Sequence, residues 1–390
     1  MFKIKTLNNI SSAGLDILRE HDNYELTDAV ENPDGYLVRS HNMHDMNLSE
    51  NLKAIARAGA GVNNIPLEKC ADKGIVVFNA PGANANAVKE LTIAAMLLSN
   101  RKIVEGIEWV KSLEGKNVDV AEKVESQKKK YVGPELKNKK LGVIGLGSIG
   151  VMVANAAGAL GMEVEGFDPY ISVDSAWELS SSVEKSQNLE SLLKTSDYIS
   201  LHIPLVEETE NMIDAKEFDM MKKGIRLINM ARGGLINNDA LINAINDGIV
   251  NKYVTDFPES ELLGIDEVIG IPHLGASTPE SSDNCAIMAV NEITDYLEDG
   301  NIENSVNYPD CKMKRSSDYR ITLANRNIPN MVGQISTYLA EEDINIKNMI
   351  NRSEGDYAYT IIDVDRDVSQ EMLETLANID GILKVRYLKV

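Results

Sequence analysis

Cysteine and histidine are scarce in this 390-residue chain, which holds three of the former and five of the latter. Cys70, Cys285 and Cys311 are odd in number and show no Cys-x-x-Cys spacing, which argues against both a disulfide framework and a zinc-ribbon site. His41 and His44 stand in a polar stretch without a second pair of ligands, so no metal is expected. The pattern predicts small buried thiols in a reducing compartment.

Long apolar runs are also missing. No stretch approaches the roughly 20 residues of a membrane-spanning helix, and the first residues hold no apolar segment of the length that a secretory signal needs. Positive charge is in deficit, with 39 Lys and Arg against 60 Asp and Glu and a net charge of −21. Because such a charge repels nucleic acids and anionic membranes, neither is an expected partner. The expected location is the cytoplasm.

An alternation of strand-like and helical patterns is present instead. The length predicts two or three domains. In the first hundred residues, runs at 36–38 and 75–78 alternate with a helical apolar series at 91–98, which indicates an α/β unit. A second series of strand-like runs indicates a doubly wound parallel sheet. These runs are residues 141–144, 164–167, 198–202, 225–229 and 252–256.

The last third of the chain has a different pattern. A helix is expected to begin at Thr278 and Pro279, as its N-cap and first residue, and to run to about residue 299. Residues 307–317 combine Pro, Ser and charge without a period, as in a linker. The remaining residues predict a ferredoxin-like βαββαβ unit. Its elements are a strand at 320–324, a helix at 331–341, strands at 344–349 and 357–364, a helix at 369–379 and a strand at 382–387.

A glycine-rich motif marks a nucleotide site. Residues 145–150 read Gly-Leu-Gly-Ser-Ile-Gly, directly after an apolar strand and before a helix-compatible run. The glycines permit a tight turn and close approach of a pyrophosphate, and the helix N-terminus supplies positive potential. The next strand ends at Asp168. A carboxylate there accepts hydrogen bonds from ribose hydroxyls and repels a 2′-phosphate, which favours NAD over NADP.

Dehydrogenation of a 2-hydroxy acid needs a base for the hydroxyl proton and a cation for the carboxylate. His273 follows a strand and precedes a small-residue turn, so it is the preferred base, while His202 is expected to cover the cofactor. Arg232 lies in a glycine-rich turn at a strand end, and its planar fork suits a carboxylate. Asp256, Glu259 and Glu261 are open alternatives for the acid that polarises the histidine.

Separated motifs then extend over nearly the whole chain. They are Arg57 to Asn64, Asn79 to Gly82, Glu90 to Thr92, Leu201 to Leu205, Asn229 to Gly234 and Pro272 to Thr278. With the glycine motif, these blocks resemble the D-isomer-specific 2-hydroxyacid dehydrogenases, most closely members that oxidise phosphoglycerate and carry a C-terminal ACT regulatory domain. The resemblance implies a Rossmann-type NAD domain at 101–271 inserted in a split, flavodoxin-like substrate domain at 1–100 and 272–306, with the ACT-like domain at 318–390.

The resemblance also implies site residues. The family's catalytic Arg, Glu and His correspond to Arg232, Glu261 and His273. The family's Asp-Val-Phe is replaced here by Thr-Asp-Phe at 255–257; counting from Asp256 selects Glu261, whereas aligning on Phe257 places Ser260 at the acid position. The residues expected at the cofactor are Ala60, Gly145, Gly147, Ser148, Ile149, Gly150, Asp168, His202, Ile203, Pro204, Met230, Ala231, Arg232, Asp256, His273, Gly275 and Ala276. Those expected at the substrate are Arg39, Ser40, Gly59, Gly61, Val62, Asn84, Arg232 and His273.

The implied activity is NAD-dependent oxidation of 3-phospho-D-glycerate to 3-phosphohydroxypyruvate, the first step of serine synthesis. Two alternatives are oxidation of another 2-hydroxy acid, as in hydroxypyruvate reductases, and a non-enzymatic NAD sensor. Asn327 and Asn345 match the family's serine-contacting asparagines and Asn325 stands where a His is frequent, so serine is an expected effector. Asn330 replaces a family glycine, which is tolerable at positive φ. A homodimer or homotetramer is expected.

Overall fold

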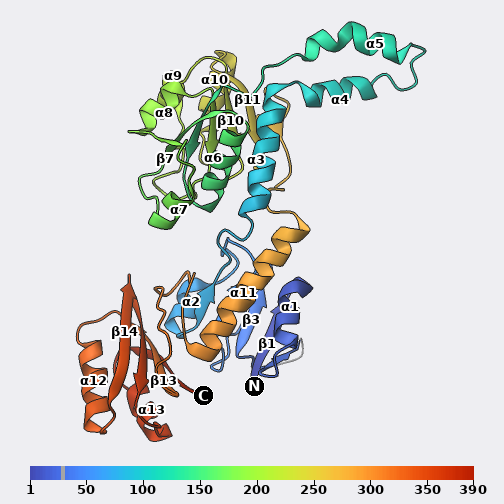
Figure 1. Ribbon diagram of the computed structural model, residues 1–390. Helices are drawn as coiled ribbons and strands as arrows, with labels where there is room; N and C mark the ends of the chain where they lie inside the picture. The colour runs from blue at the N-terminus through green and yellow to red at the C-terminus, as the bar shows by residue number, and fades with distance from the viewer. Residues whose placement is uncertain (28–30) are drawn as a thin grey trace. The chain divides into compact units, whose positions relative to one another are not determined.

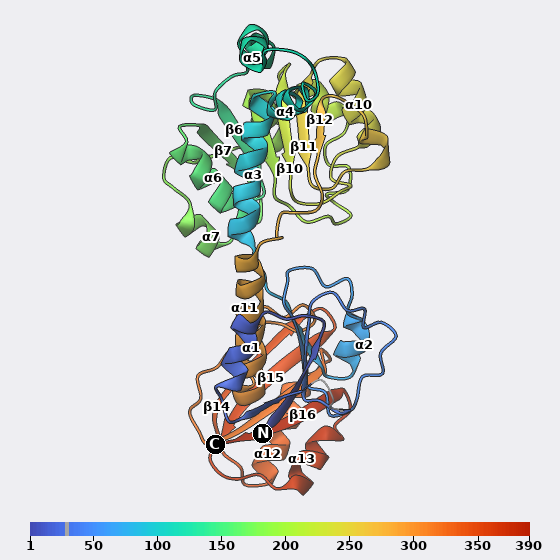
Figure 2. The same ribbon diagram turned by 90° about the vertical axis from the view of Figure 1, so that its right-hand side faces the viewer.

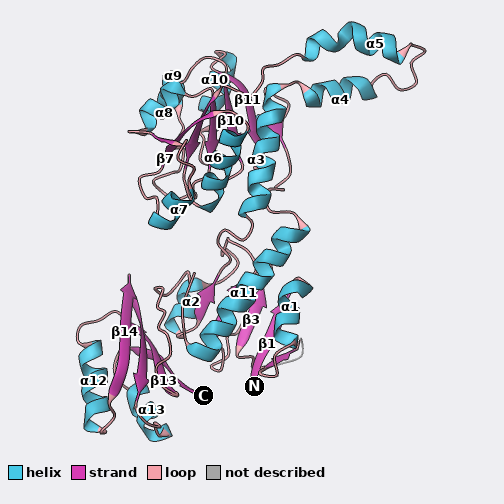
Figure 3. Ribbon diagram, in the orientation of Figure 1, coloured by secondary structure: helices cyan, strands magenta, loops and turns pink. Residues whose placement is uncertain are grey.

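A computed structural model describes residues 1–27 and 31–390, which form two compact units (Figures 1 and 3). Unit 1 is Met1–Asn84 with Pro279–Val390, and unit 2 is Ala85–Thr278. The division differs from the expected boundaries near residues 100 and 272. Helix α3 (Ala85–Asn100) belongs to unit 2, because its Val88, Ala95 and Met96 are buried in the core of that unit.

Unit 1 contains a five-stranded parallel sheet with the order β2-β1-β3-β4-β5. Its strands are β1 (Phe2–Leu7), β2 (Tyr24–Leu26), β3 (Gly35–Val38), β4 (Ala54–Arg57) and β5 (Val76–Phe78). Helices α1 (Ser12–Arg19) and α11 (Pro279–Asp299) pack on one face, and α2 (Leu67–Asp72) lies on the other (Figure 2). Helix α11 begins at Pro279 as predicted.

The C-terminal part of unit 1 is an antiparallel sheet with the order β14-β15-β13-β16. Its elements are β13 (Tyr319–Arg326), α12 (Met331–Glu341), β14 (Ile346–Glu354), β15 (Tyr357–Val364), α13 (Gln370–Ala377) and β16 (Ile382–Lys389). The predicted βαββαβ order and fold class are confirmed, although β14 extends five residues further than expected. Asn330 has a φ of 68°, in the left-handed region predicted for it.

Residues 307–317 do not form the free linker that their composition predicts. Tyr308, Cys311 and Met313 are buried, and Cys311 forms a β-bridge with Ile302. Their apolar atoms fill the same core as Tyr296 of α11 and Tyr359 of β15. Because apolar burial decides the path of this segment despite its Pro and Ser content, the C-terminal sheet and the split N-terminal segment form one compact unit.

Unit 2 is a seven-stranded parallel sheet with the order β12-β11-β10-β9-β6-β7-β8. Its strands are β6 (Lys140–Ile144), β7 (Glu163–Phe167), β8 (Glu184–Lys185), β9 (Tyr198–Leu201), β10 (Ile225–Asn229), β11 (Val250–Thr255) and β12 (Val268–Gly270). Helices α3 and α6 (Ser148–Ala159) cover one face. The other face is covered by α8 (Leu189–Thr195), α9 (Ala215–Met220) and α10 (Asn238–Asn246). The strand order reverses between β6 and β9, where such sheets bind ligands.

Residues 101–138 contain short helices that the sequence analysis does not predict. They are α4 (Ile103–Lys111), α5 (Val120–Gln127) and the 3-10 helix η1 (Lys128–Tyr131), and a further short helix, α7 (Val173–Glu178), follows β7. None of these helices has a buried residue. In α4, Ile103, Ile107 and Val110 recur at helical spacing, but their side chains are exposed. Among the helices of residues 1–27 and 31–390, none has the length and apolar character needed to cross a membrane.

Candidate active site

Two of the three glycines of the 145–150 motif are required by close backbone contacts. Gly145 has a φ of +91°, and a Cβ there would lie 2.5 Å from the carbonyl oxygen of His202. A Cβ on Gly150 would lie 1.9 Å from the Gly145 carbonyl oxygen, so only glycine lets α6 begin so close to β6. Gly147, by contrast, has nothing within 4 Å of its Cβ position and precedes the first residue of α6. This open backbone at a helix N-terminus fits a dinucleotide pyrophosphate.

Asp168 lies directly after β7 and is bound to the glycine loop. Its Oδ2 accepts a hydrogen bond from the Leu146 N–H at 2.8 Å, and its Oδ1 accepts one from the Tyr170 N–H at 2.8 Å. A carboxylate offers about four lone-pair directions, so acceptor capacity remains for ribose hydroxyls. The glycine loop and Asp168, which the sequence analysis expects to bind the same NAD cofactor, are therefore adjacent.

His202 follows β9, across the switch point from the glycine loop. Its Nε2 forms a 2.8 Å hydrogen bond with Ser200 Oγ, whereas Nδ1 is buried without a partner among the described residues. Burial lowers the pKa of His202 to about 4. A neutral imidazole fixed by a neighbouring hydroxyl suits a wall of the cofactor site, and Ile203 packs against Gly145 beside it.

Arg232 is presented by a turn that Asn229 organises. Asn229, the last residue of β10, is buried, donates to the Arg232 carbonyl oxygen at 2.8 Å and accepts from the Ala231 N–H at 3.1 Å. The Arg232 side chain is exposed, and its Nη1 donates to the Ala231 carbonyl oxygen at 2.6 Å. Its charge has no carboxylate partner within 4.0 Å in the described part of the chain, which leaves the Nε and Nη2 donors for an anion.

His273 follows β12 and is also exposed. Its ring lies against Phe257, with 4.5 Å between ring centroids. Two residues further on, the Gly275 N–H donates to Asp256 Oδ2 at 3.0 Å. Strands β10, β11 and β12 are parallel neighbours, so Arg232, Asp256 and His273 follow them at the same edge of the sheet.

The three acidic alternatives differ in their surroundings. Asp256 is 1% exposed, and its Oδ1 is buried with no partner among the described residues. Burial raises the pKa of Asp256, while the Gly275 N–H and the charge of His273 lower it. Glu259 accepts a 2.8 Å hydrogen bond from Asn238 and faces Gly233. Glu261 lies in the 3-10 helix η2 (Ser260–Leu262), where it is exposed and makes no hydrogen bond or ion pair among the described residues.

The residues expected at the substrate's phosphate and carboxylate follow strands of unit 1. Arg39 follows β3; its Nη1 donates to Ser282 Oγ of α11 at 2.6 Å. Its carbonyl oxygen accepts from Arg57 Nε at 2.9 Å, which joins it to the segment of Gly59, Gly61 and Val62 after β4. Ser40 donates its N–H to Asn8, and Asn79 donates to the carbonyl oxygen of Ala60. Asn84 is the last residue of the first segment of unit 1.

The three asparagines assigned to serine do not meet within one chain. Asn327 donates to the Gly355 carbonyl oxygen at 2.9 Å, at one end of β15, whereas Asn345 pairs with Asp365 at the other end. The eight residues of β15 between these ends span about 27 Å. Asn325 is buried near Asn327 on β13, and its Oδ1 has no partner among the described residues.

Sequence reasoning missed Asn229 and Asn238 as positioning residues. An Asn that ends a strand before a Met-Ala-Arg-Gly-Gly turn is a signal for a side chain that bonds its own turn. Asn238 opens α10 and binds Glu259, a long-range contact that no local pattern shows.

Comparisons with known proteins identify the family and the relatives to which this chain is similar. Residues 93–275 match the family described as D-isomer specific 2-hydroxyacid dehydrogenase, NAD binding domain. A D-3-phosphoglycerate dehydrogenase of Methanocaldococcus jannaschii is 34% identical over 339 residues, which cover 85% of this chain and 62% of that relative. A D-3-phosphoglycerate dehydrogenase of Escherichia coli (strain K12) is 29% identical over an alignment of 411 positions, which covers 98% of this chain and 95% of that relative.

A solved structure is similar to this chain as well. The NAD+-bound 3-phosphoglycerate dehydrogenase of Entamoeba histolytica superposes with a TM-score of 0.59 at 26% identity, over 78% of this chain and 99% of that one. The chain spans less than two thirds of the archaeal relative, and nearly all of the bacterial one. The resemblance and the NAD cofactor that the motifs predict are confirmed.

Proposed function

Since residues 93–275 match the family described as D-isomer specific 2-hydroxyacid dehydrogenase, NAD binding domain, we propose that the chain oxidises 3-phospho-D-glycerate to 3-phosphohydroxypyruvate. The observation that carries this proposal is the presence of Arg232, Asp256 and His273 at the sheet edge that also presents the glycine loop and Asp168. Relatives named for this activity match over most of the chain.

The chain's own residues have separate tasks in this reaction. Gly145, Gly147 and Asp168 would hold NAD, which supplies a hydride acceptor when bound. The guanidinium of Arg232 binds the carboxylate next to the reacting carbon through its Nε and Nη2 donors, and its charge stabilises the charge that develops on the oxygen of that carbon. His273, exposed beside Phe257, accepts the hydroxyl proton as the C2–H bond breaks. The hydride thus leaves C2 of the substrate, and the proton leaves the hydroxyl oxygen bonded to C2.

We assign the carboxylate that positions His273 to Asp256 rather than to Glu261. Asp256 is buried, is held by the backbone two residues after His273 and feels the charge of that histidine. Glu261 is exposed and has no such contact. Counting from Asp256 in the Thr-Asp-Phe segment places Glu261 at the family's acid position. The local geometry, however, supports Asp256 itself.

Arg39 supports the choice of a phosphorylated substrate. Its side chain is exposed at a strand end, and Ser282 fixes one guanidinium nitrogen. A net charge of −21 repels a trianionic substrate at long range, so a local cation is needed to bind it. Within the residues at the ends of β3 and β4, Arg39 and Arg57 provide that positive charge.

The proposal includes serine as an effector of the enzyme. A homo-oligomer of the chain binds this serine. Asn327 and Asn345 lie at opposite ends of β15, so one serine contacts both only when a second copy brings its Asn345 beside Asn327. Strand β14 is an edge strand whose outer side pairs with no strand in the described part of the chain, and such an edge can pair with a second copy.

Initial rates of NADH formation test the proposal directly. 3-Phosphoglycerate, glycerate and lactate are compared, each with and without serine. A strong preference for 3-phosphoglycerate is expected, together with inhibition by serine. Arg39→Ala is expected to reduce kcat/KM for 3-phosphoglycerate on the order of 100-fold and to leave glycerate nearly unchanged. Preference for an unphosphorylated acid would assign the chain to another reaction of the family, and no turnover of any acid would indicate a sensor.

A further inference from the structure

The residues at the C-terminal end of helix α11 do not stabilise that helix end by themselves. Its last turn contains Glu298 and Asp299 and no basic residue, and Gly300 follows with a φ of +72°. The last carbonyl oxygens of a helix lack intrahelical partners and carry partial negative charge. Two carboxylates at this end add to that charge, so the helix needs cationic donors from elsewhere in the fold.

Three arginines of the C-terminal part of unit 1 provide these donors. Arg386 Nη1 and Nη2 donate to the carbonyl oxygens of Tyr296 and Leu297 at 2.9 and 2.7 Å. Arg315 Nη2 donates to the Glu298 carbonyl oxygen at 3.0 Å, and its Nε binds Asp299 Oδ1 at 2.8 Å.

The next two carbonyls are bound in the same way. Arg320 Nη1 donates to the Asp299 carbonyl oxygen at 2.8 Å, and Tyr359 Oη donates to that of Gly300 at 2.9 Å. Every carbonyl from 296 to 300 is thus bound by the C-terminal part, and we call Arg315, Arg320 and Arg386 the arginine clamp.

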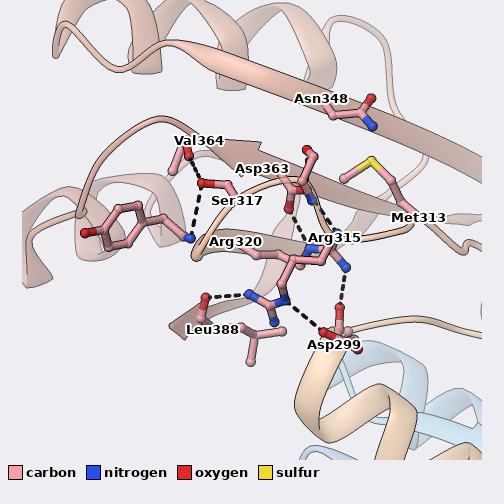
Figure 4. Close-up of polar contacts among 12 residues, drawn as sticks. Asp299, Met313, Arg315, Ser317, Arg320, Asn348, Asp363, Val364 and Leu388 are labelled. Carbon is pink, nitrogen blue, oxygen red and sulfur yellow. Dashed lines mark hydrogen bonds and ion pairs between the residues drawn. The ribbon is translucent and has the colours of Figure 1, made fainter. Parts of the chain in front are cut away.

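The clamp is rigid because its members are themselves fixed. Arg320 is fully buried and forms a bidentate pair with Asp363 at 2.6 and 3.1 Å (Figure 4). Ser316 donates to the same carboxylate through its N–H and its hydroxyl. Arg386 lies over the Tyr296 ring, 4.4 Å from its centroid. The buried, bidentate pair of Arg320 with Asp363 holds one geometry. In Arg386 both Nη atoms are bonded, whereas Nε is buried without a partner among the described residues.

The other end of α11 reaches the expected phosphate-binding arginine. Ser282, in the first turn, accepts from Arg39 Nη1 at 2.6 Å, and Asp283 accepts from Ser11 Oγ at 2.5 Å. The 21 residues of α11 extend over about 31 Å. One continuous helix therefore has the C-terminal part bound to its last turn and Arg39 bound to its first.

We propose that the C-terminal part controls substrate affinity through α11: the arginine clamp holds the helix, and the helix holds Arg39. This inference rests on the proposed function for the role of Arg39, whereas the mechanical link stands on the contacts alone. Release of the clamp loosens the last turns of α11, and the change reaches Ser282 and Arg39 because the helix is continuous. The chemical step and NAD binding do not pass through this link.

Hydrogen exchange and kinetics of the full-length protein test the proposal. The variants are Arg315→Ala and Arg386→Met. Arg320 is left intact, because its removal would leave Asp363 as a buried unpaired charge. Lys389→Met is the matched control, since Lys389 lies on β16, pairs with Asp367 and does not contact α11. Arg315→Lys keeps the charge and one donor, and it should restore part of the loss.

Amide exchange at residues 296–300 and at residues 283–287, whose N–H groups bind the carbonyls of the first helical residues, is expected to rise at least about tenfold in both test variants and not in the control. KM for 3-phosphoglycerate should rise about fivefold with kcat within about twofold, and the Kd of NADH should not change. Unchanged exchange at residues 296–300 would refute the clamp, and unchanged exchange at residues 283–287 would refute transmission. Exchange needs no substrate, so a wild-type protein inactive on phosphoglycerate would contradict the proposed function alone.

Discussion

At the scale of single residues, the carboxylates near His273 are distinguished by burial. Asp256→Asn is expected to lower kcat on the order of 100-fold with the Kd of NADH within about threefold, because the neutral amide no longer attracts the imidazolium that forms during proton transfer. Glu261→Gln, an exposed carboxylate, is expected to stay within about twofold of the parent. Steady-state kinetics over pH 6–10 and NADH fluorescence titration measure both variants. The reverse ranking would restore Glu261 to the acid position.

Asp168 predicts cofactor choice at the same scale. Its carboxylate faces the glycine loop through the Leu146 N–H. Replacement by Ser removes the charge that repels a 2′-phosphate and removes a ribose acceptor. For Asp168→Ser we expect kcat/KM with NAD to fall about tenfold or more and that with NADP to rise. Rates with the two cofactors at equal concentration measure the ratio, and an unchanged ratio would place the specificity elsewhere.

The site residues could be predicted from the sequence where a single local pattern identifies them. The glycines, Asp168, Arg232 and His273 all lie at strand ends that local periodicity marks. The choice among Asp256, Glu259 and Glu261 was not predictable, because it depends on which side chain turns inward beside the 273–275 backbone. That contact joins residues nineteen positions apart and leaves no trace in local sequence.

At the scale of elements, α11 contains a pH-sensitive group. Glu292 is buried, with Oε1 accepting from Asn304 at 2.9 Å and Oε2 unpartnered among the described residues. Burial raises its pKa to about 8; the Asn304 hydrogen bond lowers it, and Glu303 and Asp310 raise it. A pKa raised on folding means stability that is complete below the unfolded pKa of about 4.5 and is lost as pH rises through about 8.

Glu292→Gln removes this dependence. The amide keeps a partner for Asn304 and cannot ionise, so the free energy of unfolding of the variant should exceed that of the parent at pH 9 by on the order of 2 kcal/mol. Near pH 5 the two proteins should differ little. Thermal unfolding over pH 5–9 measures the difference, with Glu341→Gln, exposed on α12, as the control. A parallel pH dependence of Tm in parent and variant would show that Glu292 ionises normally.

Elements were predictable when their apolar period was strong. Helix α12, strand β15 and the start of α11 have the expected limits, whereas α5, which has no buried residue, is not predicted. The boundary at residue 84 and the packed 307–317 segment depend on contacts between distant residues. Tyr308 donates to the Ala71 carbonyl oxygen, for example, across 237 positions. Composition alone describes such a segment as a linker.

At the scale of the whole molecule, the last prediction concerns two copies of the chain. If one serine contacts Asn327 of one copy and Asn345 of another, each of the variants Asn327→Ala and Asn345→Ala loses serine inhibition. When the two variants exchange subunits, each mixed pair of subunits has two interface sites. One of these sites carries both substitutions, and the other carries neither. Serine inhibition should therefore return in the mixture, to at most about half of the sites.

The control for this mixture is the double variant Asn327→Ala/Asn345→Ala combined with either single variant, in which no intact site can form. Light scattering before and after mixing verifies that the subunits have exchanged. Recovery in the mixture but not in the control requires a site shared between chains, because each single chain separates the two asparagines by the length of β15. If exchanged subunits stay insensitive to serine, the effector binds within one chain or not at these residues.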